Sequence, residues 1–380
     1  MKQQAISTVS TVARRPVWLA AVLLSTSPWV QAQAQDTSTV TLFGTVAASA
    51  LNLSHQANGT GTRLVTGPWT APSYGLRGSE ALGGGLTASF RLESSLDLPT
   101  GGAGRTVLGS AKHFDKAAWV GLGNQQVNLT AGRQLHAGID RIAETLDVFH
   151  ANADGKLLLS ILALNATNTF GGFDTRVDDA VKLRAQLPGG VKLGFSHAFA
   201  SAGRVGRSQS MDVGMQTPAY GLGAYVLRYN SDGTQLQQNT WGLGGNVLVG
   251  PVRLYAHYMD ATHDKSAGGA TEQNNKVWGL GVAMPITPAL SMKAAYYRDN
   301  ASSVGGTEGR EGNRSTVALM GDYAFSKRTS LNFGVFRNSL SGALAADPTS
   351  LAVLGLFAPA TRSVSGKAST GVAVGLNHRF

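Results

Sequence analysis

The sequence predicts an all-β protein, a 16-stranded antiparallel transmembrane β-barrel. Apolar residues recur at every second position in segment after segment, which is the side-chain period of a strand. Short turns alternate along the chain with longer polar connections, an asymmetry typical of barrels that cross an outer membrane. Charged residues keep to one face of these segments, as a water-filled interior requires.

The chain begins with a segment that reads as a secretory signal peptide, residues 1–34, with cleavage near Ala34. It contains Lys2, Arg14 and Arg15 and no acidic residue, and an apolar run starts at Pro16. Its removal lowers the formal charge from +10 to +7, because 29 basic residues then stand against 22 acidic ones. Residues 35–380 are therefore predicted to form the barrel.

Composition excludes several classes of protein. The chain is 43% hydrophobic and 14% charged, which indicates a folded protein, and its 48 glycines follow no collagen period. The absence of cysteine excludes disulfides, a thiol nucleophile and Cys-ligated metal sites. An exported basic chain meets lipopolysaccharide, ions and small solutes, so no nucleic-acid partner is expected. The longest apolar run, 157–164, is too short for a membrane-spanning helix.

Alternation runs from one end of the barrel region to the other. Clear examples lie at 40–46, 86–93, 181–187, 278–284 and 372–380. The last of these places Val, Val, Leu, His and Phe on one face and ends the chain at Phe380. Each example predicts a strand with one face toward lipid.

Connections between the predicted strands fall into two kinds. Short turns rich in Gly, Pro, Asn and Ser are predicted at 80–85, 124–126, 188–190, around Pro218, 249–251, 285–288 and 326–328. Longer polar stretches lie at 55–63, 98–112, 200–209, 263–275, 301–313 and 340–366. Seven short turns, with a strand at each terminus, predict eight hairpins and hence 16 strands.

One long connection, residues 137–177, differs from the others. It begins with apolar residues at helical spacing, and three carboxylates follow one another at i, i+4 and i+7: Asp140, Glu144 and Asp147. It also contains the apolar run 157–164, which requires burial. We therefore expect this connection to fold into the barrel.

Several segments together resemble a known family. They are S-Y-G-L-R-G-S-E-A-L-G-G-G-L-T-A-S-F-R-L-E-S-S (73–95), V-T-L-F-G (40–44), A-A-W-V-G-L (117–122), V-N-L-T-A-G-R-Q (127–134), T-R-V-D-D-A-V-K (175–182) and G-L-N-H-R-F (375–380). In this order they are similar to the Gram-negative general-diffusion porins, in particular the betaproteobacterial branch. The resemblance implies an outer-membrane barrel, usually a homotrimer, whose long third loop folds inward and narrows the pore.

The same resemblance implies a pore constriction in which acids on that loop face arginines on the wall. Arg133 and Arg176 match two of these arginines, and Arg91 stands in a strand position that is often polar in the family. Thr45 and Ser73 occupy positions where relatives carry a basic residue. The loop lacks the P-E-F-G-G run of relatives, and L-D-V-F at 146–149 is a looser match. The expected constriction comprises Arg91, Arg133, Arg176, Asp140, Glu144 and Asp147.

Further basic residues are predicted on the polar face of the strands. These lumen-wall residues are Lys182, Arg184, Lys192, Arg253 and Lys293. They outnumber the acids on the same strands, so a weak preference for anions is expected. Phe380 resembles the terminal signal that the barrel-assembly machinery recognises, and lipopolysaccharide is a further expected partner.

The sequence offers little for an enzyme. It contains no G-x-S-x-G, H-E-x-x-H or EF-hand spacing, and no metal or other cofactor is expected. The expected activity is passive diffusion of small hydrophilic solutes and ions across the outer membrane of a Gram-negative bacterium. The alternatives are a substrate-specific channel and an outer-membrane barrel hydrolase with a Ser/His pair on its outer rim.

Overall fold

The computed structural model describes residues 38–56, 59–67, 69–103, 112–150, 175–199, 206–230, 236–264, 271–347, 350 and 367–380. The chain divides into two units, Met1–Gln35 and Asp36–Phe380, and every described residue belongs to the second. No helix among the described residues is long and apolar enough to cross a membrane.

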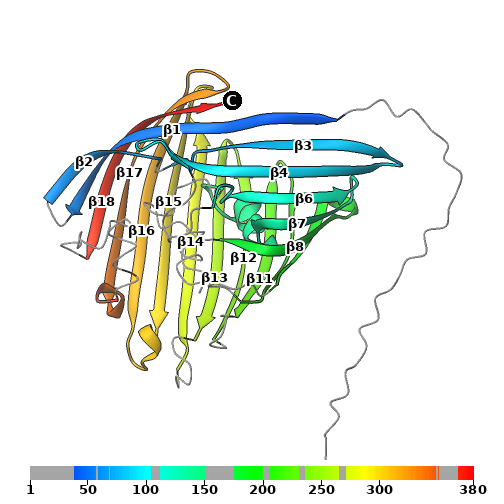
Figure 1. Cartoon of the computed structure of the whole chain (residues 1–380). Helices are drawn as coiled ribbons and strands as arrows, with labels where there is room; N and C mark the ends of the chain where they lie inside the picture. The colour runs from blue at the N-terminus through cyan, green and yellow to red at the C-terminus, as the bar shows by residue number, and fades with distance from the viewer. Residues whose placement is uncertain are drawn as a thin grey trace, which may run out of the picture. The chain divides into compact units, whose positions relative to one another are not determined.

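The described strands form one antiparallel sheet that closes on itself (Figure 1). Closure is made by β1 (Thr39–Gln56), which pairs with β18 (Ala368–Arg379) in the register Thr45↔Arg379 to Leu53↔Gly371. On its other side β1 pairs with β2 (Gly59–Val65) and then with β3 (Ser73–Gly83), which act as two pieces of one barrel strand. The two-residue β5 (Gly102–Ala103) only extends β4. Within the described residues the barrel therefore has the 16 strands expected.

The remaining strands follow one another around the barrel in chain order. They are β4 Leu86–Asp97, β6 Ala117–Gly123, β7 Val127–Leu135, β8 Arg176–Gln186, β9 Val191–Ala198, β10 Ser208–Gln216, β11 Tyr220–Asn230, β12 Gln237–Val249, β13 Val252–His263, β14 Gln273–Pro285, β15 Leu290–Ser302, β16 Gly312–Ala324 and β17 Thr329–Gly342. Short 3₁₀ turns lie at Pro188–Gly190, Val304–Gly306 and Ala343–Ala345.

The predicted turns are confirmed by the strand boundaries. All seven short connections join consecutive antiparallel strands, from β3–β4 at 84–85 to β16–β17 at 325–328. The longer polar stretches lie mostly at the strand connections of the opposite end of the barrel. The stretch 55–63 is the exception, because β1 extends to Gln56 and residues 59–63 belong to β2, which pairs with β1. One further connection at that end, 231–236 between β11 and β12, was not among the predicted ones.

The phase of the apolar residues is confirmed as well. The expectation that charged residues keep to the inner face is wrong near the long-loop ends of the strands, where Arg228, Lys276, Arg298 and Arg337 share the outward parity. Predicted lipid-facing residues are strongly exposed, for example Val40 at 69%, Leu280 at 57% and Val372 at 55% of their accessible surface. Their neighbours in the strand face inward, where space is filled by polar groups, small residues and the long loop. Apolar side chains are exposed on the outside and polar side chains are buried on the inside. This distribution is the reverse of that in a soluble protein, and it is the one expected for a barrel surrounded by lipid.

The start of the long connection lies inside the barrel. It forms α1 (Ala137–Arg141), which runs into a single π-helical turn, Ile142–Leu146. Its apolar residues Ile139, Ile142, Leu146 and Phe149 are all buried, each contributing about 1.5–3 kcal/mol by removal from water. This burial holds the loop segment against the inner wall formed by β10–β13. Residues 151–174, which include the apolar run 157–164, lie outside the described residues.

Candidate functional site

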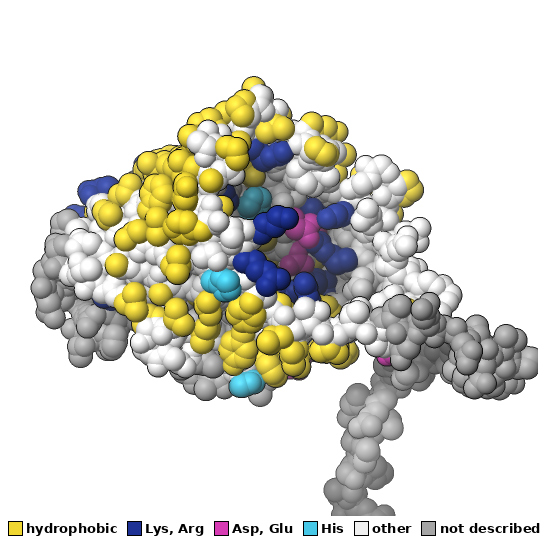
Figure 2. Space-filling view, turned by 90° about the horizontal axis from the view of Figure 1, so that it is seen from above, with side chains coloured by type: hydrophobic (Ala, Val, Ile, Leu, Met, Phe, Trp, Pro, Cys, Tyr) yellow, Lys and Arg dark blue, Asp and Glu magenta, His cyan; other side chains and the backbone are white. Residues whose placement is uncertain are grey.

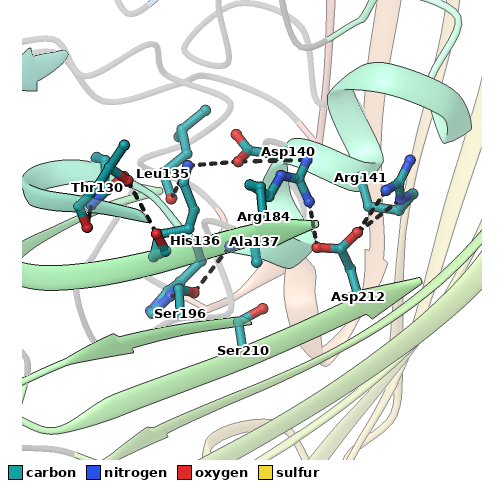
Figure 3. Close-up of polar contacts among 12 residues, drawn as sticks. Thr130, Leu135, His136, Ala137, Asp140, Arg141, Arg184, Ser196, Ser210 and Asp212 are labelled. Carbon is teal, nitrogen blue, oxygen red and sulfur yellow. Dashed lines mark hydrogen bonds and ion pairs between the residues drawn. The ribbon is translucent and has the colours of Figure 1, made fainter. Parts of the chain in front are cut away.

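The inner loop is attached to the wall by a fully buried ion pair. Arg141, in α1, donates from Nε at 3.0 Å and from Nη2 at 2.8 Å to Oδ1 of Asp212 on β10. Both side chains have no solvent-exposed surface. The second carboxylate oxygen, Oδ2, accepts at 2.6 Å from Nη1 of Arg184 on β8 (Figure 3). Asp212 thus joins one arginine of the loop to one arginine of the wall.

Glycines on the wall make room for this bridge. Gly194 on β9 lies between Arg184 and Asp212 in the strand register. A Cβ at this position would lie 2.0 Å from Oδ2 of Asp212 and 2.5 Å from Nη1 of Arg184. On β11, a Cβ at Gly223 would lie 2.5 Å from Cδ of Arg141. The absence of these side chains allows the arginine and the carboxylate to approach across the sheet.

The first turn of the loop is fixed by wall hydroxyls. The backbone N–H of Ala137 donates to Ser196 Oγ at 3.1 Å, and that of Gly138 donates to Ser210 Oγ at 2.9 Å. These bonds satisfy amide groups that a helix N-terminus leaves without an intrahelical partner. The wall therefore supplies the cap that α1 itself lacks.

His136, between β7 and α1, completes this attachment. Its Nδ1 lies 2.8 Å from Ser196 Oγ and its Nε2 lies 2.9 Å from Ser208 Oγ. Complete burial, with the positive charges of Lys182 and His197 nearby, lowers the pKa of His136 to about 3. The ring is therefore neutral at physiological pH, donating from one nitrogen and accepting at the other.

Two loop carboxylates face a row of cations on β8 and β9. Oδ2 of Asp140 lies 2.6 Å from Lys182 Nζ and 3.8 Å from Arg184 Nη2. Glu144 lies 2.9 Å from Arg184 and 3.7 Å from Lys192. These side chains are partly exposed, so the pairs line the water-filled space beside the loop.

The third predicted acid, Asp147, is buried at the end of the π-helical turn. Its Oδ1 accepts a 2.5 Å hydrogen bond from Tyr297 on β15. Two residues before it, the main-chain oxygen of Thr145 accepts a 2.8 Å hydrogen bond from Asn246 Nδ2 on β12. Asp147 thus links the loop to the wall opposite β8, where Tyr255 and Tyr297 are also buried.

The far end of the described loop rests on aromatic rings. Phe149 stacks on Trp69, with ring centroids 6.1 Å apart, and Trp69 packs edge-on against Phe336 at the same distance. Trp69 comes from the segment between β2 and β3, where the second barrel strand is interrupted. Next to these rings is a cavity of about 210 Å³ whose charged lining is Lys293, Asp322 and Arg379.

The three predicted wall arginines make other contacts. Arg91 donates to Glu93 on its own strand at 2.6 and 2.9 Å and lies over the Phe43 ring. Arg133 binds Asp178 at 2.8 Å and the main-chain oxygen of Asp115 at 2.7 Å. Arg176 donates to the main-chain oxygen of Lys116 at 3.1 Å. The wall partners of Asp140 and Glu144 are instead residues on β8 and β9, because α1 packs against β9, β10 and β11, and Glu144 also pairs with Arg141 of the loop.

The remaining predicted wall residues also lie inside the barrel. Arg253 donates to Asn246 Oδ1 and to the main-chain oxygen of Pro218, both at 2.5 Å. Lys293 lines the cavity near Phe149. Phe380 closes the barrel, because its amide donates to the Gly44 oxygen at 3.1 Å and its own oxygen accepts from the Gly44 amide at 3.2 Å. Among the described residues no cluster of His, Asp and Glu suits a metal ion.

Two residues of the site were missed at the sequence level. Asp212 alternates with Ser208 and Ser210 on the inward face of β10. This alternation of polar residues in the sequence could have predicted that Asp212 faces the lumen. Arg141 directly follows Asp140 and gave no comparable signal, because its role depends on the wall that it meets. Seen into one mouth of the barrel, Lys and Arg side chains gather around a hollow that has acidic side chains near its centre (Figure 2).

A closed barrel with an apolar outer surface, a charged interior and an inward loop has the architecture of a channel across an outer membrane. Residues 19–343 match the family described as "Gram-negative porin", and the chain belongs to this family. It is therefore a porin of the Gram-negative outer membrane, a barrel that lets small hydrophilic solutes and ions diffuse through a water-filled pore.

The relatives agree with this family. The chain is similar to outer membrane porin protein 32 of Delftia acidovorans, with 24% identity over 356 residues, 90% of this chain and 94% of that protein. The anion-selective porin from Comamonas acidovorans has a similar fold, with a TM-score of 0.73, 22% identity and coverage of 90% and 100% of the two chains. The trimer form of OmpT from Vibrio cholerae has a TM-score of 0.63, 12% identity and coverage of 91% and 100%.

Proposed function

We propose that the channel prefers small anions. One observation carries the proposal: two of the three loop acids, Asp140 and Glu144, are paired with cations, whereas a lumen cation is not paired with a described acid. Asp140 and Glu144 lie against lysine or arginine, and Asp212 lies between two arginines. Among the described residues Arg253, by contrast, binds only neutral acceptors, and Lys293 forms no hydrogen bond or ion pair, although the carboxylates of Asp147 and Asp322 act on it electrostatically. Arg253 is therefore a lumen cation whose positive charge no described carboxylate compensates. A porin of Comamonas acidovorans with a similar fold is described as anion-selective, which agrees with this proposal.

The loop 137–177 is proposed to form the constriction. Its described part crosses from β8 to the β13–β15 side of the lumen, and ion pairs attach it along the way. We assign the narrow zone to Asp140, Glu144 and Asp147 together with Lys182, Arg184 and Lys192. Arg91, Arg133 and Arg176 are proposed to line the adjoining wall, where they hold local acids and backbone.

The mechanism is passive. Opposed rows of fixed charge, acidic on the loop and basic on β8 and β9, create a transverse field in the water-filled space between them. Polar solutes and ions exchange part of their hydration shell for contacts with these charged groups. Apolar solutes make no such contacts, so nothing offsets the free-energy cost of displacing the ordered water. We propose that the chain performs no catalysis and requires no cofactor.

The remaining partners are proposed from the family resemblance. Residues 1–34 serve export, and Phe380 is read by the barrel-assembly machinery. The mature barrel is a homotrimer, in line with the trimer form of a Vibrio cholerae porin of the same fold. Outer-leaflet lipid, including lipopolysaccharide, surrounds it.

The reversal potential under a KCl gradient in a planar bilayer tests the preference. We expect an anion-biased potential for the refolded protein and a shift toward cations when Arg253 and Lys293 are both replaced by Gln. Lys327→Gln together with Arg328→Gln is the matched control, because it removes two positive charges from an exposed short turn outside the lumen. A cation-biased potential for the unaltered protein would refute the proposal, and so would an equal shift in the control.

A further inference from the structure

The outward face of the barrel carries cations as well as apolar side chains. Four basic residues lie on the outer face of the barrel, at alternate positions with lipid-facing residues and near the ends of their strands that lead into long loops. They are Arg228 on β11, Lys276 on β14, Arg298 on β15 and Arg337 on β17. Val226, Leu280 and Val335, on the same faces, are 49%, 57% and 39% exposed. We call these four residues the outer basic band.

The outer basic band lies just beyond aromatic side chains. Trp241, Tyr258 and Trp278 form a contiguous row across β12–β14, with ring centroids 5.3 and 4.5 Å apart. Along β14 the outward residues run from Lys276 through Trp278 to Leu280 and Val282. Aromatic belts mark the depth at which hydrocarbon gives way to headgroups. Lys276 therefore lies at headgroup depth.

The band differs from the interior in its electrostatic partners. Several arginines inside the barrel lie against carboxylates, as Arg141 does on Asp212 and Arg314 on Asp299. Among the described residues, the arginines of the band bind only neutral groups. Their acceptors are Gln237 for Arg228, Asn300 and Asn313 for Arg298, and Thr370 for Arg337.

Lys276 has no hydrogen bond or ion pair with a described residue, although an acid lies next to it in the sheet. Asp260 is its register partner on β13. That carboxylate accepts from Asn274 Nδ2 at 2.7 Å and from the Tyr258 hydroxyl at 3.4 Å and forms no ion pair with the lysine. The four cations of the band therefore form no ion pair with a carboxylate that the structure describes.

We propose that the outer basic band, with the aromatic row beneath it, binds the phosphate groups of a phosphorylated lipid in the outer leaflet. The long loops are extracellular in this family of barrels, so the band meets the outer leaflet. A lipid fits both parts of the surface, because its acyl chains cover the aromatic row while its phosphates reach the cations. Amides and hydroxyls hold the guanidinium groups of Arg298 and Arg337 in place without neutralising them. The inference deepens the lipid contact proposed above and does not depend on the ion preference of the pore.

The test uses nanodiscs of phosphatidylcholine that contain the refolded full barrel and 5 mol% lipid A, either diphosphorylated or dephosphorylated. Native mass spectrometry counts lipid A bound to the protein. We expect the phosphorylated form to bind and the dephosphorylated form to bind at least tenfold more weakly. The triple variant Arg228→Gln, Lys276→Gln, Arg298→Gln should weaken binding of the phosphorylated form about a hundredfold, roughly fivefold for each charge. Inorganic phosphate at the same concentration should not displace the lipid.

The control is Lys327→Gln together with Arg328→Gln, which removes two exposed cations from the short β16–β17 turn at the opposite end of the barrel and should leave lipid binding unchanged. Equal binding of the two forms of lipid A, or unchanged binding by the triple variant, would overturn the proposal. Displacement by inorganic phosphate would identify a site for the free ion instead, and a changed oligomeric state of the triple variant would identify a subunit interface; either result would also overturn it. KCl conductance is measured on the same preparations. Loss of lipid binding with normal conductance concerns the outer basic band alone, whereas loss of conductance concerns the proposed channel function.

Discussion

Asp212→Asn should release the inner loop from the wall. The carboxylate is fully buried and holds Arg141 and Arg184 at 2.6 to 3.0 Å. Removing one partner of a buried ion pair costs about 3–5 kcal/mol, because the other charge stays buried without compensation. Arg141 retains a longer bond of 3.3 Å to Glu144, so the lower end of that range applies. A loss of about 3 kcal/mol raises the detached fraction of the loop roughly a hundredfold.

The assay can use a single introduced thiol, because the chain contains no cysteine. Thr145→Cys places it at a fully buried position in the π-helical turn, at little change in side-chain volume. A small methanethiosulfonate reagent that enters the pore then labels only the detached loop. Labelling should be roughly a hundredfold faster in the Asp212→Asn background, and single-channel recordings should show greater open-state current noise.

The control is Asp299→Asn in the same Thr145→Cys background. Asp299 forms an equally buried pair with Arg314, at 2.5 Å, but contacts β14 and β16 rather than the loop. This variant should destabilise the barrel without faster labelling. Equal labelling of Asp212→Asn and the unaltered chain, in a barrel shown to be folded by its heat-modifiable migration, would refute the assignment of Asp212 as the loop anchor.

Three further predictions concern the same loop. The pKa of His136 is lowered to about 3 from an ordinary 6.5, so the unfolded chain binds the proton more readily than the folded one. The attachment of the loop should therefore weaken as the pH falls below 6.5 toward 3. Labelling of the Thr145→Cys loop should accelerate over this pH range, and His136→Gln should abolish that acceleration. Trp69→Ala should remove the ring on which Phe149 stacks, at a cost of about 3–5 kcal/mol, and raise channel noise, whereas Trp69→Phe should largely preserve the recordings. Gly194→Ala should separate the guanidinium and carboxylate groups that meet beside it and speed labelling, and an unchanged rate would contradict the close approach inferred there.

The barrel itself was predictable from the sequence because its signals are local. The side-chain period of two decides which residues of a strand meet lipid, and Val40, Leu280 and Val372 lie on the predicted outer face. The short turns carry their own Gly, Pro and Asn residues, so their positions could be read without a structure. Loop acids and lumen cations could also be named individually, since both types of residue are costly to place in lipid.

Pairing across the lumen was not predictable. Arg141 and Asp212 are 71 residues apart, and Phe149 meets Trp69 from a different strand connection, so no local pattern joins them. The sequence by itself determined the sheet, its turns and its lipid face, because these depend on neighbours along one strand. Only the tertiary structure decided that the loop lies on β9–β11 and meets Lys182, Arg184 and Lys192, because the position of a loop in a barrel depends on where the opposite wall leaves space for it.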